Sequence, residues 1–212
     1  CRRFSDQKLP GKLFLNISPE SLMETAHQPG RTLQLLRDFG IPPSQVVIEL
    51  TEQTPTDDFD LLQTALHHYR NMGFSIALDD LGAGYSSLRL WSELRPDYVK
   101  IDRHFIDGIH QDALKREFVG SILQIARASR AQVIAEGIEL PEELAVLTEM
   151  GVDLVQGYLL CRPQEQPPQE ARLMLPKPDQ TTVTLNDEGS DLSALLNDQP
   201  AVDQGTATAK VL

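Results

Sequence analysis

The sequence is short of basic side chains, cysteines and long apolar runs. Its 19 Lys and Arg residues face 31 Asp and Glu residues, which gives a net charge of −12 at pH 7. Nucleic-acid polymers are bound through basic surfaces that displace counterions, so this shortage argues against such a partner. A small phosphorylated ligand is still compatible with the charge, because a bound metal ion can reverse the local electrostatics.

The two cysteines, Cys1 and Cys161, stand far apart in the sequence. They form neither a disulfide framework nor a metal-binding pair, which indicates a reducing cytoplasm. No apolar run approaches the roughly 18 residues that a membrane-spanning helix needs, and no signal peptide is visible. The chain begins at Cys1 rather than at Met, so we expect it to belong to a longer protein. A cytoplasmic domain of a membrane-tethered protein is compatible with these features.

What the sequence does contain is an alternation of short apolar runs with amphipathic stretches. Short runs rich in Val, Ile and Leu are typical of buried parallel strands. The predicted strands are Lys12–Ile17, Val46–Leu50, Ser75–Leu78, Tyr98–Ile101, Gln132–Ala135 and Asp153–Leu160.

Helices are predicted between these runs. One helix has an apolar face and ends at Gly73; the face consists of Leu62, Ala65, Leu66 and Tyr69. A second apolar face is predicted from Phe118, Ile122, Ile125 and Ala126. A last helix is expected over Pro141–Met150, ending at Gly151.

The alternation predicts an α/β fold with a parallel sheet, which fits both an open doubly wound sheet and a TIM barrel. Polar residues at the ends of separate strands favour the barrel, because its strand ends converge on one mouth. These residues are Asn16, Glu49, Asp79, Asp80, Lys100, Glu136 and Gln156. We therefore predict an incomplete TIM-barrel-like fold with about six β/α units over residues 1–175. Residues 176–212, rich in Asp, Gln, Thr and Pro, predict an acidic linker or disordered tail.

The adjacent carboxylates of Asp79 and Asp80 repel each other unless a cation holds them. Together with Asn16 and Glu49 they predict an oxygen-rich site for Mg²⁺ or Mn²⁺. The alternative for either aspartate is capping of the next helix. Lys100 interrupts an apolar strand and predicts either a site cation or a structural ion pair with Asp102 or another neighbour.

Glu136 and Glu139 flank Gly137 after another strand. One of them is a candidate metal ligand or general base, and the other is a candidate helix-start charge.

Six segments occur in the order and spacing of EAL domains, so the chain resembles that family from about Leu13 to Pro163. They are Leu13–Ser18, Ile48–Glu52, Asp79–Leu88, Val99–Asp102, Ala135–Glu139 and Gln156–Pro163. The resemblance implies an EAL-type barrel that hydrolyses cyclic di-GMP to linear pGpG with two Mg²⁺ or Mn²⁺ ions. We also expect a homodimer, and other sensory or signalling domains in the parent chain.

The resemblance further implies roles for single residues. Asn16, Glu49 and Asp79 resemble ligands of a first metal ion, and Asp79 with Asp80 resembles ligands of a second. Glu136 matches a second-metal or general-base glutamate, and Lys100 the residue that positions the attacking water. Glu52 resembles an anchor of the loop Leu81–Ser87. Gln156, Glu139 and Pro163 match substrate-binding positions.

The sequence departs from the family at Leu81, where Phe is usual, and at Cys161, where Gly or Ser is common; both changes should be mild. The Glu-Ala-Leu tripeptide, whose glutamate is a first-metal ligand, does not occur before Asn16. We therefore expect residues 1–212 alone to be inactive. The alternatives are a degenerate EAL domain that binds cyclic di-GMP as a receptor, an unrelated metal-dependent barrel enzyme such as a lyase or aldolase, and a structural or interaction domain.

Overall fold

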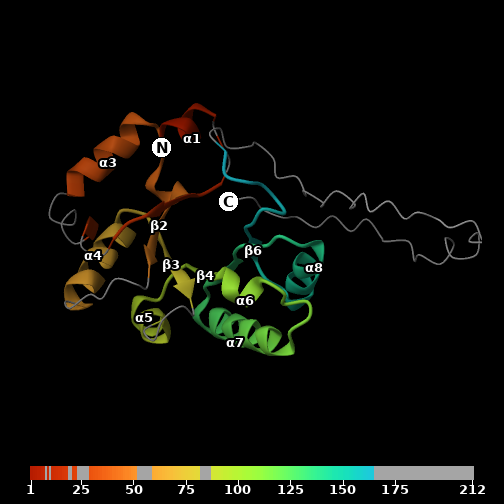
Figure 1. The fold of residues 1–212 in the computed structure, drawn as a ribbon. Coiled ribbons are helices and arrows are strands. Elements are labelled where there is room, and N and C mark those ends of the chain that lie inside the picture. The colour runs from red at the N-terminus through yellow and green to blue at the C-terminus, as the bar shows by residue number, and fades with distance from the viewer. Residues whose placement is uncertain are drawn as a thin grey trace, which may run out of the picture. The chain divides into compact units, whose positions relative to one another are not determined.

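The computed structural model describes residues 1–7, 9, 11–18, 21–22, 29–51, 59–81 and 87–164. Its strands form one parallel sheet in which the spatial order follows the chain order, from β1 to β6 (Figure 1). The strands are β1 Leu13–Asn16, β2 Val46–Thr51, β3 Ser75–Leu81, β4 Tyr98–Ile101, β5 Gln132–Ala135 and β6 Leu154–Val155. The sequential order and the parallel pairing are those of a (β/α) barrel, so the predicted fold class is confirmed.

Four strands differ in extent from the prediction. β1 is one residue shorter at each end, and β2 is one residue longer, ending at Thr51. β3 continues to Leu81 and therefore contains both aspartates. β6 covers only Leu154–Val155, because the chain turns soon afterwards at Gly157. A Cβ atom on Gly157 would lie 2.1 Å from the backbone oxygen of Ile138, so only glycine fits this close approach.

Helices connect successive strands and cover the outer face of the sheet (Figure 1). They are α3 Pro29–Asp38, α4 Phe59–Asn71, α5 Ser87–Leu94, α6 Arg103–Ile106, α7 Ala113–Ser129 and α8 Pro141–Met150, with a 3₁₀ turn at Pro43–Gln45. A further helix, α1 Arg2–Asp6, precedes β1. The predicted buried face of α4 is confirmed, and Gly73 follows this helix with φ +97°. The predicted helix Pro141–Met150 and its end at Gly151 are also confirmed.

The predicted buried face of α7 is partly wrong. Ile122 and Ala126 are buried, but Phe118 is 42% and Ile125 40% exposed. The buried face is completed instead by Val119 and Leu123. Apolar residues occupy two neighbouring stripes of this helix, and packing against the sheet selects the stripe one residue further along. Phe118 stacks on Phe105, with ring centroids 4.3 Å apart.

The strands bury both faces, and each face has its own apolar cluster. Side chains such as Ile48, Leu78 and Val99 join the core beneath the helices. The residues next to them in sequence point to the inner face, because side chains alternate along a strand. There they form a separate layer of one residue per strand, made of Phe14, Val47, Ala77, Tyr98, Ile134 and Leu154. This layer is the floor beneath the polar strand ends.

The first and last strands of the described sheet each have one strand neighbour, β2 for β1 and β5 for β6. In the part of the chain that the structure covers, no helix is long and apolar enough to cross a membrane. The predicted tail over residues 176–212 lies outside the described residues, as do Glu52 and most of the loop Leu81–Ser87.

Candidate active site

A layer of polar residues lies directly above the apolar floor. Each member stands two residues after a floor residue on the same strand or its extension, so alternation places both on the inner face of the sheet. The polar layer consists of Asn16, Glu49, Asp79, Lys100, Glu136 and Gln156. We expected the strand ends to bring these polar residues to one side of the sheet, and the arrangement in the structure agrees.

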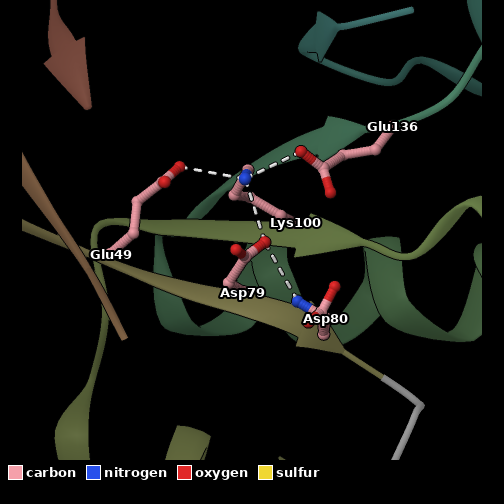
Figure 2. A network of polar contacts seen from close by, with 5 residues as sticks. All are labelled: Glu49, Asp79, Asp80, Lys100 and Glu136. Carbon is pink, nitrogen blue, oxygen red and sulfur yellow. Dashed lines mark hydrogen bonds and ion pairs between the residues drawn. The ribbon is translucent and has the colours of Figure 1, made fainter. Parts of the chain in front are cut away.

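Lys100 is the centre of this layer (Figure 2). Its Nζ atom lies 3.0 Å from Glu49 Oε1, 2.9 Å from Asp79 Oδ1 and 2.7 Å from Glu136 Oε1. The four side chains come from β2, β3, β4 and the residue after β5, and none is more than 17% exposed. Three carboxylates around one ammonium leave an excess of negative charge in a largely buried place.

The surroundings shift the pKa values of Glu49, Glu136 and Lys100. Burial raises the pKa of Glu49 and of Glu136, and this effect outweighs the attraction of Lys100, which acts in the opposite direction. For Lys100, burial alone would lower the pKa, but the carboxylates of Glu136, Asp79 and Glu49 together raise it. Lys100 is therefore a permanent cation at neutral pH, whereas the two glutamates take up a proton more readily than usual.

Asp79 and Asp80 direct their side chains to the same region, although neighbours in a regular strand point to opposite faces. The register between β3 and β4 shifts between Leu78 and Leu81, and Asp80 has φ +56°. Such a left-handed residue within a strand is typical of a β-bulge, which re-aims a side chain. The amide N–H of Asp80 donates to Asp79 Oδ1 at 3.1 Å (Figure 2).

Carboxylate oxygens of Asp79, Asp80 and Glu136 lie within 4.8 Å of one another. Several carboxylates at this spacing supply the hard oxygen donors that Mg²⁺ and Mn²⁺ prefer. The residues present therefore fit a divalent metal ion. The alternative in which either aspartate caps the next helix does not apply to α5, since that helix begins only at Ser87.

The segment after β5 turns at Gly137, which has φ +72°. A Cβ atom there would lie 2.5 Å from Arg103, so the Arg103 side chain crosses directly over this turn. Arg103 Nη2 then pairs with Glu139 Oε1 at 3.0 Å. Asp102, the alternative partner of Lys100, instead caps α6 by accepting the amide N–H of His104.

A cavity of about 840 Å³ adjoins the acidic cluster. Glu136, Glu139, Gln156 and Pro163, all predicted as site residues, line this cavity. Its basic lining residues are Arg3, Lys12, Arg103 and Arg162, and the last of these lies over the ring of Tyr158 at 4.4 Å. A chain with a net charge of −12 thus gathers four basic side chains around one cavity.

None of these four basic residues was predicted as a site residue from the sequence. Arg103 carried a usable signal, since it directly follows the predicted strand Tyr98–Ile101 and Asp102. Arg3 and Lys12 carried none, because their place beside the β6 end depends on tertiary structure. Asn16 lies exposed at the end of β1, opposite Glu49 in the strand register.

Comparison with known proteins gives a consistent family. The profile of the family described as "EAL domain" matches residues 1–163. The chain is 35% identical over 158 residues to the cyclic di-GMP phosphodiesterase PdeF of Escherichia coli K12, and 33% identical over 159 residues to the probable cyclic di-GMP phosphodiesterase PdeA of that organism. These alignments cover 74% and 75% of the chain but only 21% and 22% of the relatives, so the chain spans about a fifth of their length.

Solved structures agree with the sequence matches. Klebsiella pneumoniae BlrP1, in a complex with calcium and cyclic di-GMP, is similar with a TM-score of 0.71 and 34% identity, covering 76% of this chain and 41% of that one. A standalone EAL protein from Vibrio cholerae O395, in its cyclic di-GMP-bound form, has a TM-score of 0.73 and 28% identity, covering 80% of this chain and 72% of that one.

Proposed function

The chain belongs to the EAL domain family, and on this basis we propose that it forms part of a phosphodiesterase that hydrolyses cyclic di-GMP to linear pGpG. The observation that carries the proposal is the cluster of Lys100 with Glu49, Asp79 and Glu136 at the strand ends. It adjoins a cavity whose lining includes four basic side chains. The volume of about 840 Å³ is within the usual range for small-molecule sites.

The proposed cofactors are two divalent ions, Mg²⁺ or Mn²⁺. Asp79, Asp80 and Glu136 would hold one of them, because their oxygens already lie within 4.8 Å of one another. Asn16, Glu49 and Asp79 would hold the other. When bound, these ions would supply positive charge that attracts the phosphodiester and stabilises the charge that develops during hydrolysis. We also propose that Glu52 anchors the loop Leu81–Ser87.

The residues of the chain then divide the remaining work. The Lys100 ammonium stays charged and donates hydrogen bonds, so it orients the attacking water and neutralises phosphate charge. Glu136 accepts the proton of that water. Water adds to phosphorus as one bridging P–O bond breaks, which opens the ring. The departing oxygen takes up a proton from the solvent and becomes the free hydroxyl of linear pGpG. Gln156, Glu139 and Pro163 contact the dinucleotide from the cavity wall.

The proposed partner in assembly is a second copy of the chain. Leu114, Phe118 and Ile125 are 77%, 42% and 40% exposed and lie on one face of α7. An exposed apolar stripe of this kind supports a helix-to-helix dimer contact. Light scattering should report a dimer that Phe118→Glu converts to a monomer. A dimer that persists in this variant would reject the α7 contact. We further propose a cytoplasmic protein in which other sensory or signalling domains control this one.

The test of the function is an assay for pGpG with Mg²⁺ or Mn²⁺, on the full-length natural protein and on the 212-residue chain. Turnover that EDTA abolishes and added Mn²⁺ restores is the expected result for the full-length protein. Binding of cyclic di-GMP without turnover would instead identify a receptor. Neither binding nor turnover by the full-length protein would refute both.

A further inference from the structure

A buried carboxylate outside the acidic cluster joins two segments of the cavity wall. Glu143, in the first turn of α8, is 1% exposed. Its Oε1 atom accepts the amide N–H of Gly108 at 2.9 Å, and its Oε2 atom accepts those of Glu139 and Leu140 at 3.1 Å. A buried carboxylate is costly unless such donors satisfy it, so these bonds explain how Glu143 is accommodated.

Helix capping accounts for only part of this pattern. Leu140 occupies the N-cap position of α8 and has no capping side-chain oxygen, so a glutamate three residues later is the natural acceptor for its amide. The Gly108 bond is different, because it reaches 35 residues back to the turn after α6. A surface cap needs neither that partner nor nearly complete burial.

The two segments that donate hydrogen bonds to Glu143 contain an ion pair of the cavity wall. Arg103 is the first residue of α6, and Gly108, whose amide N–H donates to Glu143, lies in the turn after this helix. The same carboxylate holds the backbone of Glu139, the residue that pairs with Arg103 at 3.0 Å. Arg103 and Glu139 both line the cavity beside Glu136. Glu143 thus fixes the backbone on both sides of the Arg103–Glu139 pair without reaching the cavity itself.

We propose that Glu143 is a positioning residue, which sets the spacing between the segments after β4 and β5 and so holds Glu139 and Arg103 for contact with the ligand. The inference rests on the proposed function, since the ligand is taken to be cyclic di-GMP. Glu143 belongs neither to the acidic cluster nor to the residues that line the cavity, and it contacts the lining residue Glu139 through the backbone amide alone. Its loss should therefore weaken ligand binding more than it slows the chemical step.

The experiment compares Glu143→Gln with Glu142→Gln in the full-length natural protein. Both changes remove one negative charge from the first turn of α8, but Glu142 is exposed. A glutamine at position 143 keeps one acceptor oxygen and turns an NH₂ group toward a backbone donor. The amides of Gly108 or of Glu139 and Leu140 should then exchange hydrogen about tenfold faster, which reports local opening. Glu142→Gln should leave these rates unchanged.

Kinetics provide the second readout. Glu143→Gln should raise KM for cyclic di-GMP about tenfold while kcat changes less than about threefold, because binding contacts shift and the Lys100 cluster does not. Glu143→Asp tests the long-range bond without loss of charge. Its carboxylate still caps α8, but the side chain is one methylene shorter and reaches less far toward Gly108. The exchange rate of the Gly108 amide and the KM should therefore both rise, as in Glu143→Gln.

The outcomes distinguish a failure of the positioning role from a failure of the proposed function. Unchanged exchange at Gly108, Glu139 and Leu140 in both Glu143 variants would overturn the inference, and so would faster exchange with an unchanged KM. An equal rise of KM in Glu142→Gln would overturn it as well. If the wild type binds cyclic di-GMP without turnover, the proposed function fails but the inference is still tested, since Kd from calorimetry takes the place of KM.

Discussion

Replacing Lys100 by methionine tests the electrostatic balance of the site. The substitution removes the ammonium that lies within 3.0 Å of Glu49, Asp79 and Glu136. Methionine keeps the length and apolar body of the side chain, so packing above the floor is nearly conserved. What changes is that three largely buried carboxylates lose their shared cation.

The size of the effect follows from burial. Removing one partner of a buried ion pair typically costs about 3–5 kcal/mol, because the other charge is left uncompensated. Glu49 and Glu136 already have raised pKa values, so the protein can protonate one of them and reduce that loss. We therefore expect the lower end of the range, about 3 kcal/mol at neutral pH. For a chain of this size that lowers Tm by about 6–12 °C.

The sign of the pH dependence is fixed by the same groups. A carboxyl whose pKa is raised in the folded state contributes stability that is present at low pH and is lost as the pH rises through the raised value. Lys100 opposes the raised pKa of Glu49 and Glu136, so its removal raises both further. The difference in Tm between wild type and variant should therefore be small near pH 4 and grow toward pH 7–8, a window set by the ordinary carboxyl pKa.

The assay is thermal unfolding followed by circular dichroism over this pH range, with and without Mn²⁺. Lys115→Met is the matched control, because Lys115 Nζ donates to one backbone carbonyl, that of Asp107, at the surface. Mn²⁺ should stabilise Lys100→Met more than wild type, since the ion then has no ammonium to displace from the carboxylates. A variant that melts like wild type at neutral pH would refute the view that Lys100 neutralises the cluster.

Three further outcomes are expected. Asp79→Asn should lower turnover of cyclic di-GMP by at least about 100-fold with an unchanged circular dichroism spectrum, and near-normal hydrolysis would contradict its role as a site residue. Gly157→Ala should lower the free energy of unfolding by more than about 1–3 kcal/mol, because its Cβ atom would meet the backbone of Ile138 at 2.1 Å; a urea titration measures this, and an unchanged midpoint would reject the close approach. Mn²⁺ affinity, measured by calorimetry, should begin to fall on acidification while the pH is still above the ordinary glutamate range. The reason is that the metal needs deprotonated carboxylates and the pKa values of Glu49 and Glu136 are raised. An affinity that is flat down to pH 4.5 would show that neither glutamate is a ligand.

Much of the site was predictable because it interrupts a strong pattern. Lys100 stands out within the apolar strand Tyr98–Ile101, and Asp79 ends the run Ser75–Leu78, so each is visible as a polar residue in a buried strand. The parallel fold then brings such residues to one side of the sheet. The order and spacing of six short segments made the family recognisable as well, and the fold agrees with that prediction.

Other features could not be read from the sequence. Glu143 has the appearance of any acidic residue in a first helical turn, and only the tertiary fold brings Gly108 to it. The prediction of the buried face of α7 was partly wrong because the helix has two neighbouring apolar stripes, one with Phe118 and one with Val119. The helical period fits both, and only packing against the sheet decides which of them is buried. The roles of Asn16 and of Glu52 in metal binding and loop anchoring stay predictions.

The bulge at Asp80 places two unrelated demands on one position. A backbone with φ +56° accepts glycine, asparagine and aspartate most readily. The cluster of carboxylates from Asp79, Asp80 and Glu136, by contrast, requires an acidic side chain at position 80, either aspartate or glutamate. Aspartate is the one residue type that satisfies both. In a saturation library, a screen for folded protein should therefore recover asparagine and glycine at position 80, while a screen for turnover should recover aspartate alone. Position 79 lacks the left-handed backbone, so the two screens would there differ by charge alone.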